Sequence, residues 1–276
     1  MERKKMISVS MAVLLSAVVL ASVLGPEQIA RYKDKATLNQ IIVEESDSAN
    51  EGYRYTLSSN EKLFLLSKCL EHQALQENEL SAGPGAESSD VDYGELMGAY
   101  AFVMNRQGPS GREITAEEIF QICNQEINIL RGRGVLPDEV REVEPASYSA
   151  VLYSAIDVLE PQNNMPVWKV SLSTSQQNAD KTNRLIDAYI DAVTGRIYGF
   201  YVRTESVWSE IEPKKMVELW SDYLGLTGLT DYDSSNPLLE TTPDFEKYCF
   251  PGTEEGNTIV TVGFYEGINE LFLKII

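Results

Sequence analysis

The chain is organised around a strand, Trp168-Lys169-Val170-Ser171-Leu172, and a hairpin, Tyr189-Ile190-Asp191-Ala192-Val193-Thr194-Gly195-Arg196-Ile197-Tyr198-Gly199-Phe200-Tyr201-Val202. In both stretches the side chains alternate with the period of two that a β-strand with one buried face requires. Between the two hairpin runs, Asp191 and Gly195 predict a turn. An Asp side chain caps a turn, and Gly tolerates a left-handed backbone conformation. We therefore expect an antiparallel hairpin with a short loop that ends in Gly.

The same stretch resembles the PepSY domain of extracytoplasmic bacterial proteins over about residues 148–202. In that family, a strand centred on Trp and a later Asp-Ala-x-Thr-Gly-x-Ile turn form paired strands under a helix. The motif is moderately specific, because Asp-x-x-Thr-Gly also arises in unrelated hairpins. The matching positions are Trp168, Val170, Asp191, Ala192, Thr194, Gly195 and Ile197.

The resemblance implies a binding or regulatory module. PepSY-like domains are associated with restraint of peptidases or other envelope partners. Membrane-anchored two-domain regulators of cell-wall sensor kinases, of the YycH/YycI type, have a related architecture. The motif brings no catalytic, cofactor-binding or metal-binding residues with it, so its matching residues are expected to be structural.

Residues 1–25 are predicted to form a signal anchor or transmembrane helix. A basic Arg3-Lys4-Lys5 segment precedes an uncharged, mostly apolar run over 6–24. That run is close to the length that spans a bilayer core. Positive charge on the short side predicts that this side faces the cytoplasm and that the rest is extracytoplasmic. A cleavable signal peptide begins in the same way, but the long run followed by Pro26 favours an uncleaved, single-pass anchor in the cell membrane.

The charge of the chain excludes one class of function. The formal net charge is −19, whereas a nucleic-acid-binding surface needs clustered Lys and Arg. Without Glu2, Arg3, Lys4 and Lys5, the 23 basic and 42 acidic residues become 20 and 41 beyond residue 25. This acidic surface is expected to favour solubility or a basic partner and to be repelled by anionic lipid and wall polymers.

Four segments follow from the pattern along the chain. The anchor is followed by a predicted juxtamembrane linker over residues 26–52 and by a predicted, mainly helical portion over residues 53–145. Helices are expected over 58–76, 93–105 and 115–131, from apolar residues at helical spacing and from two Ser/Thr-x-x-Glu capping boxes. Residues 146–276 predict a PepSY-like α+β portion.

Within that last portion, Pro213 begins an expected helix that Gly225 ends. This helix fits the same unit or the start of a second, degenerate one. Strands are expected over 246–250, 258–265 and 270–276. The predicted fold class is therefore α+β, with antiparallel sheets, helices packed on one face, and a preceding N-terminal transmembrane helix.

Metal-binding patterns in the chain are weak. His72 is the only histidine and follows Cys69 by three positions, with no further Cys or His nearby. The Asp231-x-Asp233-x-Ser235 pattern begins like a calcium loop but lacks the Gly and the final acid. The cysteines (Cys69, Cys123 and Cys249) do not make a disulfide framework and are expected to be small buried apolar residues, although one pair could be bridged after export.

Three functions remain open. The first is a membrane-anchored extracytoplasmic binding or regulatory protein that contacts an envelope kinase, peptidase or membrane complex. The second is a cell-envelope hydrolase with paired carboxylates, which would show a deep cleft and two acids about 5–10 Å apart. The third is a scaffold component with a broad apolar patch. We expect the first, and therefore no enzyme and no cofactor.

Overall fold

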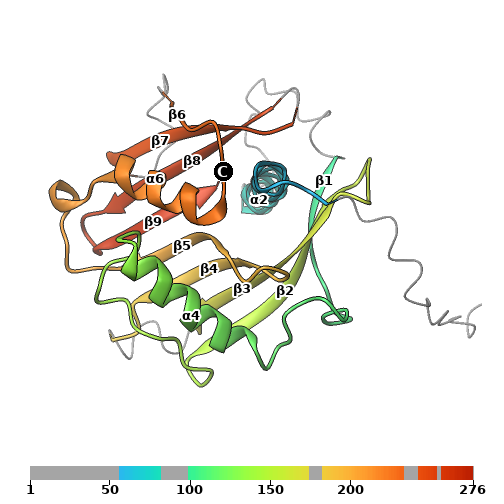
Figure 1. The fold of residues 1–276 in the computed structure, drawn as a ribbon, viewed down its shortest axis with the longest axis horizontal. Coiled ribbons are helices and arrows are strands. Elements are labelled where there is room, and N and C mark those ends of the chain that lie inside the picture. Colours follow the sequence, from blue (N-terminus) through green and yellow to red (C-terminus); the bar gives the residue numbers. More distant parts are fainter. Residues whose placement is uncertain (1–55, 82–98, 174–181, 233–241, 254–255, 276) are drawn as a thin grey trace, which may run out of the picture. The chain divides into compact units, whose positions relative to one another are not determined.

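The computed structural model describes residues 56–81, 99–173, 182–232, 242–253 and 256–275, and Arg54 to Ile276 form one compact unit. These residues contain an α+β fold with one large antiparallel sheet (Figure 1). The helices are α2 (Ser59–Ser81), α4 (Ile119–Gly132), α6 (Pro213–Leu224) and the short 3-10 helix η2 (Trp208–Glu210). The strands are β1 (Tyr100–Met104), β2 (Tyr148–Asp157), β3 (Asn164–Leu172), β4 (Leu185–Asp191), β5 (Ile197–Arg203), β6 (Thr230–Asp231), β7 (Asp244–Pro251), β8 (Asn257–Tyr265) and β9 (Glu270–Ile275).

The sheet is built from two similar halves. Its strand order is β1-β2-β3-β4-β5-β9-β8-β7-β6, and every neighbouring pair is antiparallel. One half is α4 followed by β2 to β5, and the other is α6 followed by β6 to β9. The last strands of the halves, β5 and β9, pair with each other through a register that sets Phe200 opposite Leu273. A helix followed by four antiparallel strands therefore occurs twice.

The final hairpin of each half has a residue with a left-handed backbone conformation in its loop. In the β4–β5 loop this residue is Gly195, which has a φ of 77° and is followed by Arg196 before β5 begins. The β8–β9 loop ends at Asn269, which has a φ of 53°. Glycine adopts the left-handed region without strain, and Asn tolerates it better than most residues with a Cβ, so both residues suit this backbone conformation.

Helices cover both faces of the sheet. Lys62 of α2 pairs with Asp191, which lies opposite Val167 in the register. The next residue, Trp168, points to the other face and donates a hydrogen bond to the Ile114 carbonyl just before α4. The expectation of helices on one face is therefore wrong for α2, around which the sheet curves (Figure 1). An amphipathic stripe shows that a helix has a buried side but not which sheet face receives it.

One part of the hydrophobic core lies between the sheet and the helices α4 and α6. The register places Val170, Ala188, Phe200, Leu273 and Val262 in one row across five strands. Each of these side chains is at most 1% exposed. This face buries the apolar stripes of both helices, which include Ile119, Cys123, Ile127, Leu130, Val217 and Trp220.

Most expected elements are present. The Ser58–Glu61 capping box forms as such a motif should. The Ser58 amide donates to Glu61 Oε2 at 2.7 Å, and the Glu61 amide donates to Ser58 Oγ at 3.3 Å. Gly225 ends α6 in the left-handed conformation, with a φ of 71°. The helix expected over 93–105 is wrong, since residues 100–104 form strand β1. Pairing along the whole of β1 with β2 outweighs a local spacing that matches a helix.

Candidate functional site

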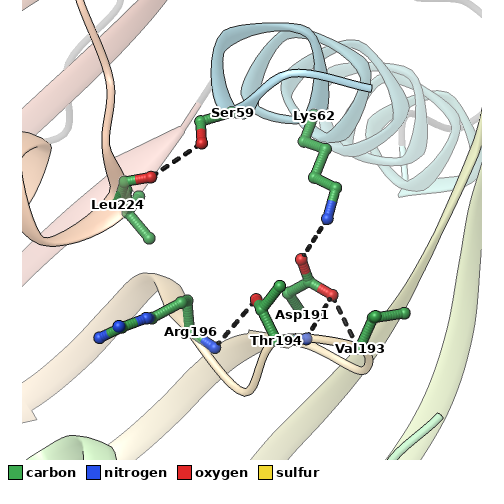
Figure 2. A network of polar contacts seen from close by, with 7 residues as sticks. All are labelled: Ser59, Lys62, Asp191, Val193, Thr194, Arg196 and Leu224. Atoms are coloured by element: carbon green, nitrogen blue, oxygen red, sulfur yellow. Dashed lines mark hydrogen bonds and ion pairs between the residues drawn. The ribbon is translucent and has the colours of Figure 1, made fainter. Parts of the chain in front are cut away.

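The helices α2, α4 and α6 all attach to one short segment, the hairpin turn, defined here as residues 191–197. Its central carboxylate belongs to Asp191, which is fully buried. Lys62 Nζ of α2 lies 2.7 Å from Asp191 Oδ2, while Oδ1 accepts hydrogen bonds from the backbone amides of Val193 and Thr194 (Figure 2). Both oxygens are therefore engaged, and the motif carboxylate connects α2 to the turn.

Gly195 connects the hairpin turn to α4. Its φ of 77° lies in the left-handed region, where a residue with a Cβ is strained. A Cβ at this position would also lie 2.7 Å from Ile122 Cγ2 of α4. Glycine is required twice here, once by the backbone and once by the close approach of the helix.

The chain just before α4 is held between Trp168 and the hairpin turn. Trp168 Nε1 donates to the Ile114 carbonyl at 2.9 Å, and the Ile114 amide donates to the Ala192 carbonyl at 2.7 Å. The Ala192 amide in turn donates to the Pro166 carbonyl of β3 at 2.9 Å. The Trp-centred strand and the turn therefore act together to position the start of α4.

Ile197 connects the hairpin turn to α6. Its amide donates to Tyr223 Oη at 2.8 Å, and its carbonyl accepts from Trp220 Nε1 at 3.3 Å. The Tyr223 hydroxyl donates onward to Glu126 of α4 at 2.5 Å, and Arg196 lies over the Tyr223 ring at 4.6 Å. Burial and the hydrogen bond to Glu126 raise the pKa of Tyr223 well above its usual value, so this hydroxyl stays protonated as a donor.

Side chains in the first turn of α2 also form hydrogen bonds with the second half of the fold, which contains α6 and β6 to β9. Ser59 Oγ donates to the Leu224 carbonyl at the end of α6, at 2.8 Å (Figure 2). Asn60 Nδ2 donates to the carbonyls of Thr227 and Pro251 at 3.0 and 2.8 Å, and Asn60 Oδ1 accepts from the Thr227 amide. We call these bonds and the Lys62–Asp191 ion pair the α2 clamp, because they fix one helix end to both halves.

A cavity of about 460 Å³ lies at the α2 clamp. Lys62, Arg196 and Tyr198 bring positive charge and hydrogen-bonding groups to its wall, beside Asp191 and Asp222. In this arrangement Asp191 accepts hydrogen bonds on both oxygens, so its carboxylate serves to position the helices. The complete lining is Leu57, Ser59, Lys62, Asp191, Thr194, Arg196, Tyr198, Asp222, Tyr223, Leu224 and Gly225.

The remaining motif residues have defined places. Val170 is fully buried in the core, and Thr194 Oγ1 accepts a hydrogen bond from the Arg196 amide at 3.4 Å. The whole motif thus lies in one connected region of β3, β4 and β5, which contains Trp168, Val170, Asp191, Thr194, Gly195 and Ile197.

The residues weighed as metal or disulfide candidates lie apart. Cys69 and Cys123 are buried, Cys249 is partly buried, and all three are free thiols. His72 is buried, and its Nε2 atom has no hydrogen-bond partner. Within the part of the chain that the structure describes, no group of three His, Cys, Asp or Glu side chains could hold a metal ion. Most of the calcium-like pattern after Asp231 falls outside the described residues.

Among the described residues, Glu270 is a carboxylate with a raised pKa. Burial raises the pKa of Glu270, Asp187 adds to the effect, and Arg203 opposes it. The Arg203 Nε atom lies 3.6 Å from Glu270 Oε1, so Glu270 is part of an ion pair at the start of β9.

Sequence reasoning missed the partners of the hairpin turn. Lys62 is 129 residues from Asp191, and Tyr223 is 97 residues from Glu126. No local pattern links residues so far apart. The sequence contained one signal, which was Asp191 at the end of a strand whose pattern predicts burial. A buried carboxylate requires a cationic or amide partner.

No family model, curated protein or solved structure matches the chain. None of the helices in the described residues is long and apolar enough to cross a membrane, and the anchor predicted at 1–25 lies outside those residues.

Proposed function

We propose that this protein is a membrane-anchored, extracytoplasmic binding or regulatory protein that acts through protein–protein contact on an envelope kinase, peptidase or membrane complex. In this proposal the N-terminal segment crosses the cell membrane once, and the sheet unit lies outside. The PepSY-like motif at residues 168–197 then has a structural role, and the protein is not an enzyme.

The observation that carries the proposal is the α2 clamp. Residues 1–25 have the charge pattern and length of a membrane anchor, and α2 is the first described helix after them. The first turn of α2 is bonded to the hairpin turn and to the end of α6. A displacement of the chain before α2 would therefore be transmitted to both halves of the sheet. A regulator that couples the membrane to a binding domain requires such a connection.

The edge strand β1 supports a contact with another protein. In the described residues β1 pairs only with β2, and the Val103 and Met104 side chains are 50% and 48% exposed. An edge strand with unpaired backbone groups can accept an extended segment from a partner. We expect the partner to present such a segment to β1.

A crosslinking pull-down from native membranes tests the proposal. A photo-crosslinking residue is placed at Val103, and a matched copy carries it at Val193, which is also exposed but lies in the hairpin turn. The full-length chain is compared with a copy that lacks residues 1–25. We expect one membrane kinase, peptidase or transporter to be captured at position 103 of the full-length chain only.

The hydrolase alternative gives a different result. Capture of no membrane protein at position 103, together with turnover of a wall-derived glycan or peptide by the copy lacking residues 1–25, would contradict the proposal. Substitution Glu270→Gln would then identify whether the acid with the raised pKa carries that turnover.

A further inference from the structure

A second cavity, of about 200 Å³, lies between α2 and the sheet face that curves around it. Leu70, Gln73 and Ala74 line it from α2. Lys169 of β3 and Lys274 of β9 line it from the sheet, together with apolar and aromatic side chains of β4, β5 and β9. The cavity is therefore largely apolar but has two lysines in its wall.

One row of the sheet explains why space exists there. The register sets Lys169 opposite Tyr189 and Tyr189 opposite Gly199, and Lys274 follows on the next strand. Gly199 has no side chain, so the row is interrupted between Tyr189 and Lys274. A Cβ on Gly199 would lie 3.1 Å from the Leu273 carbonyl oxygen and 3.8 Å from Tyr189 Cδ2. Close strand packing thus keeps position 199 empty, and the gap forms part of the cavity wall.

Each of the two lysines in this row lies over an aromatic ring. Lys169 Nζ lies 5.4 Å from the centre of the Tyr189 ring, and Lys274 Nζ lies 5.3 Å from the centre of the Phe272 ring. Burial acts to lower the pKa of Lys169, but Tyr189 and Asp187 outweigh it and the pKa is raised. Lys169 is therefore charged at neutral pH although it is half-buried.

We propose that this cavity binds a small carboxylate with a short hydrocarbon body. Ligand sites are mostly apolar with a few placed polar groups, and an anionic head is complementary to lysine side chains. The apolar lining from Leu70, Ala74 and the sheet would contact the hydrocarbon body. The volume lies below the usual range of about 300–1,000 Å³ for ligand pockets, which selects a ligand of few atoms. This inference goes beyond the proposed regulatory function and does not depend on a partner.

Ligand-observed saturation-transfer NMR tests the site with the full-length chain in lipid nanodiscs, beside empty nanodiscs. The probes are hexanoate, hexyl phosphate, hexanol and hexylamine, which share one hydrocarbon chain and differ in the head group. The test variants are Lys169→Gln, Lys274→Gln and Ala74→Leu, which fills the cavity from α2 and keeps both charges. Lys247→Gln is the matched control, because Lys247 lies in the same sheet row, 5.7 Å over an aromatic ring, but does not line the cavity.

We expect saturable binding of hexanoate and none of hexylamine. Loss of a charged hydrogen-bond partner should raise the Kd of hexanoate about tenfold in each lysine test variant, and Ala74→Leu should abolish binding. Lys247→Gln should leave the Kd unchanged. Unfolding midpoints near that of the parent would show that the variants are folded. Hexanol binding as tightly as hexanoate, preference for hexyl phosphate, an equal effect of Lys247→Gln, or no saturable signal would each overturn the assignment.

Discussion

Substitution of Lys62 by Met tests the α2 clamp, because it removes the charge and keeps most of the side-chain volume. Asp191 Oδ2 would then lose the cation that lies 2.7 Å away, while Oδ1 would keep its two backbone amides. The Asp191 side chain is 0% exposed, so only water that enters the cavity at the α2 clamp could replace the lost partner. The variant therefore leaves a buried carboxylate with one unpaired oxygen.

The expected loss follows from the geometry. Removal of one partner from a buried ion pair costs about 3–5 kcal/mol of unfolding free energy. The two amides that remain on Oδ1 place Lys62→Met near the lower end, at about 3 kcal/mol. For a folded unit of this size, the Tm should fall by about 6–12 °C. Asp191→Asn keeps an acceptor for the turn amides and should cost about 2 kcal/mol.

Urea unfolding followed by tryptophan fluorescence measures these free energies, and a double-mutant cycle isolates the pair. The double variant should lose less than the sum of the single variants, with a coupling of about 1.5 kcal/mol or more. Lys214→Met is the control. It breaks the Lys214–Asp231 ion pair of similar length, 3.0 Å, but both side chains are more than half exposed. That control should leave the unfolding free energy almost unchanged, because solvent screens an exposed ion pair.

Two results taken together would contradict a stabilising role for the Lys62–Asp191 ion pair. One is a loss in Lys62→Met no larger than in the Lys214→Met control. The other is a coupling near zero in the double-mutant cycle. Both would mean that the ion pair seen at the hairpin turn contributes nothing to holding α2.

Three further predictions concern the turn, the pH response and the last strand. Gly195→Ala should lose about 2–4 kcal/mol in urea unfolding, because it combines a left-handed φ with a clash against Ile122. Gly108→Ala, which has a left-handed φ but open space around the Cβ, should lose only about 1 kcal/mol. Partial burial opposes the shift, but hydrogen bonds from a hydroxyl and backbone amides lower the pKa of Glu139. A lowered folded-state pKa stabilises above the unfolded value and is lost as the pH falls. After allowance for solvent screening, Glu139→Gln should therefore cost at most about 1 kcal/mol at pH 7, and this cost should disappear progressively as the pH falls from about 4 through the lowered folded-state pKa in a pH series of urea titrations. Deletion of β9 should abolish the cooperative unfolding transition seen by circular dichroism, because β9 joins the two halves of the sheet.

Local patterns predicted the elements whose causes are local. The turn at Asp191 and Gly195 followed from an Asp cap and a left-handed glycine, and both are present. The start of α2 followed from its capping box, and the end of α6 from Gly225. In each case the residues that cause the structure lie within a few positions of one another, so the feature can be predicted from the sequence alone.

Long-range contacts determine the features that local sequence patterns did not predict. Positions 96, 100 and 103 have helical spacing, yet β1 is a strand because β2, far along the chain, supplies its hydrogen bonds. The face on which α2 packs depends on Lys62 reaching Asp191 across 129 residues. The hairpin turn could be predicted as a turn, but its role as the common attachment of three helices required the tertiary structure.

The most direct test of the account is partner capture by the full-length chain with an intact and a broken clamp. Photo-crosslinking at position 103 is repeated in the parent, in Lys62→Met and in Lys214→Met, at a temperature where all three are folded. If the protein is a membrane-anchored regulator that acts through the α2 clamp, the parent and Lys214→Met will capture the same membrane protein and Lys62→Met will capture markedly less. Equal capture by all three, or capture by none, would contradict it.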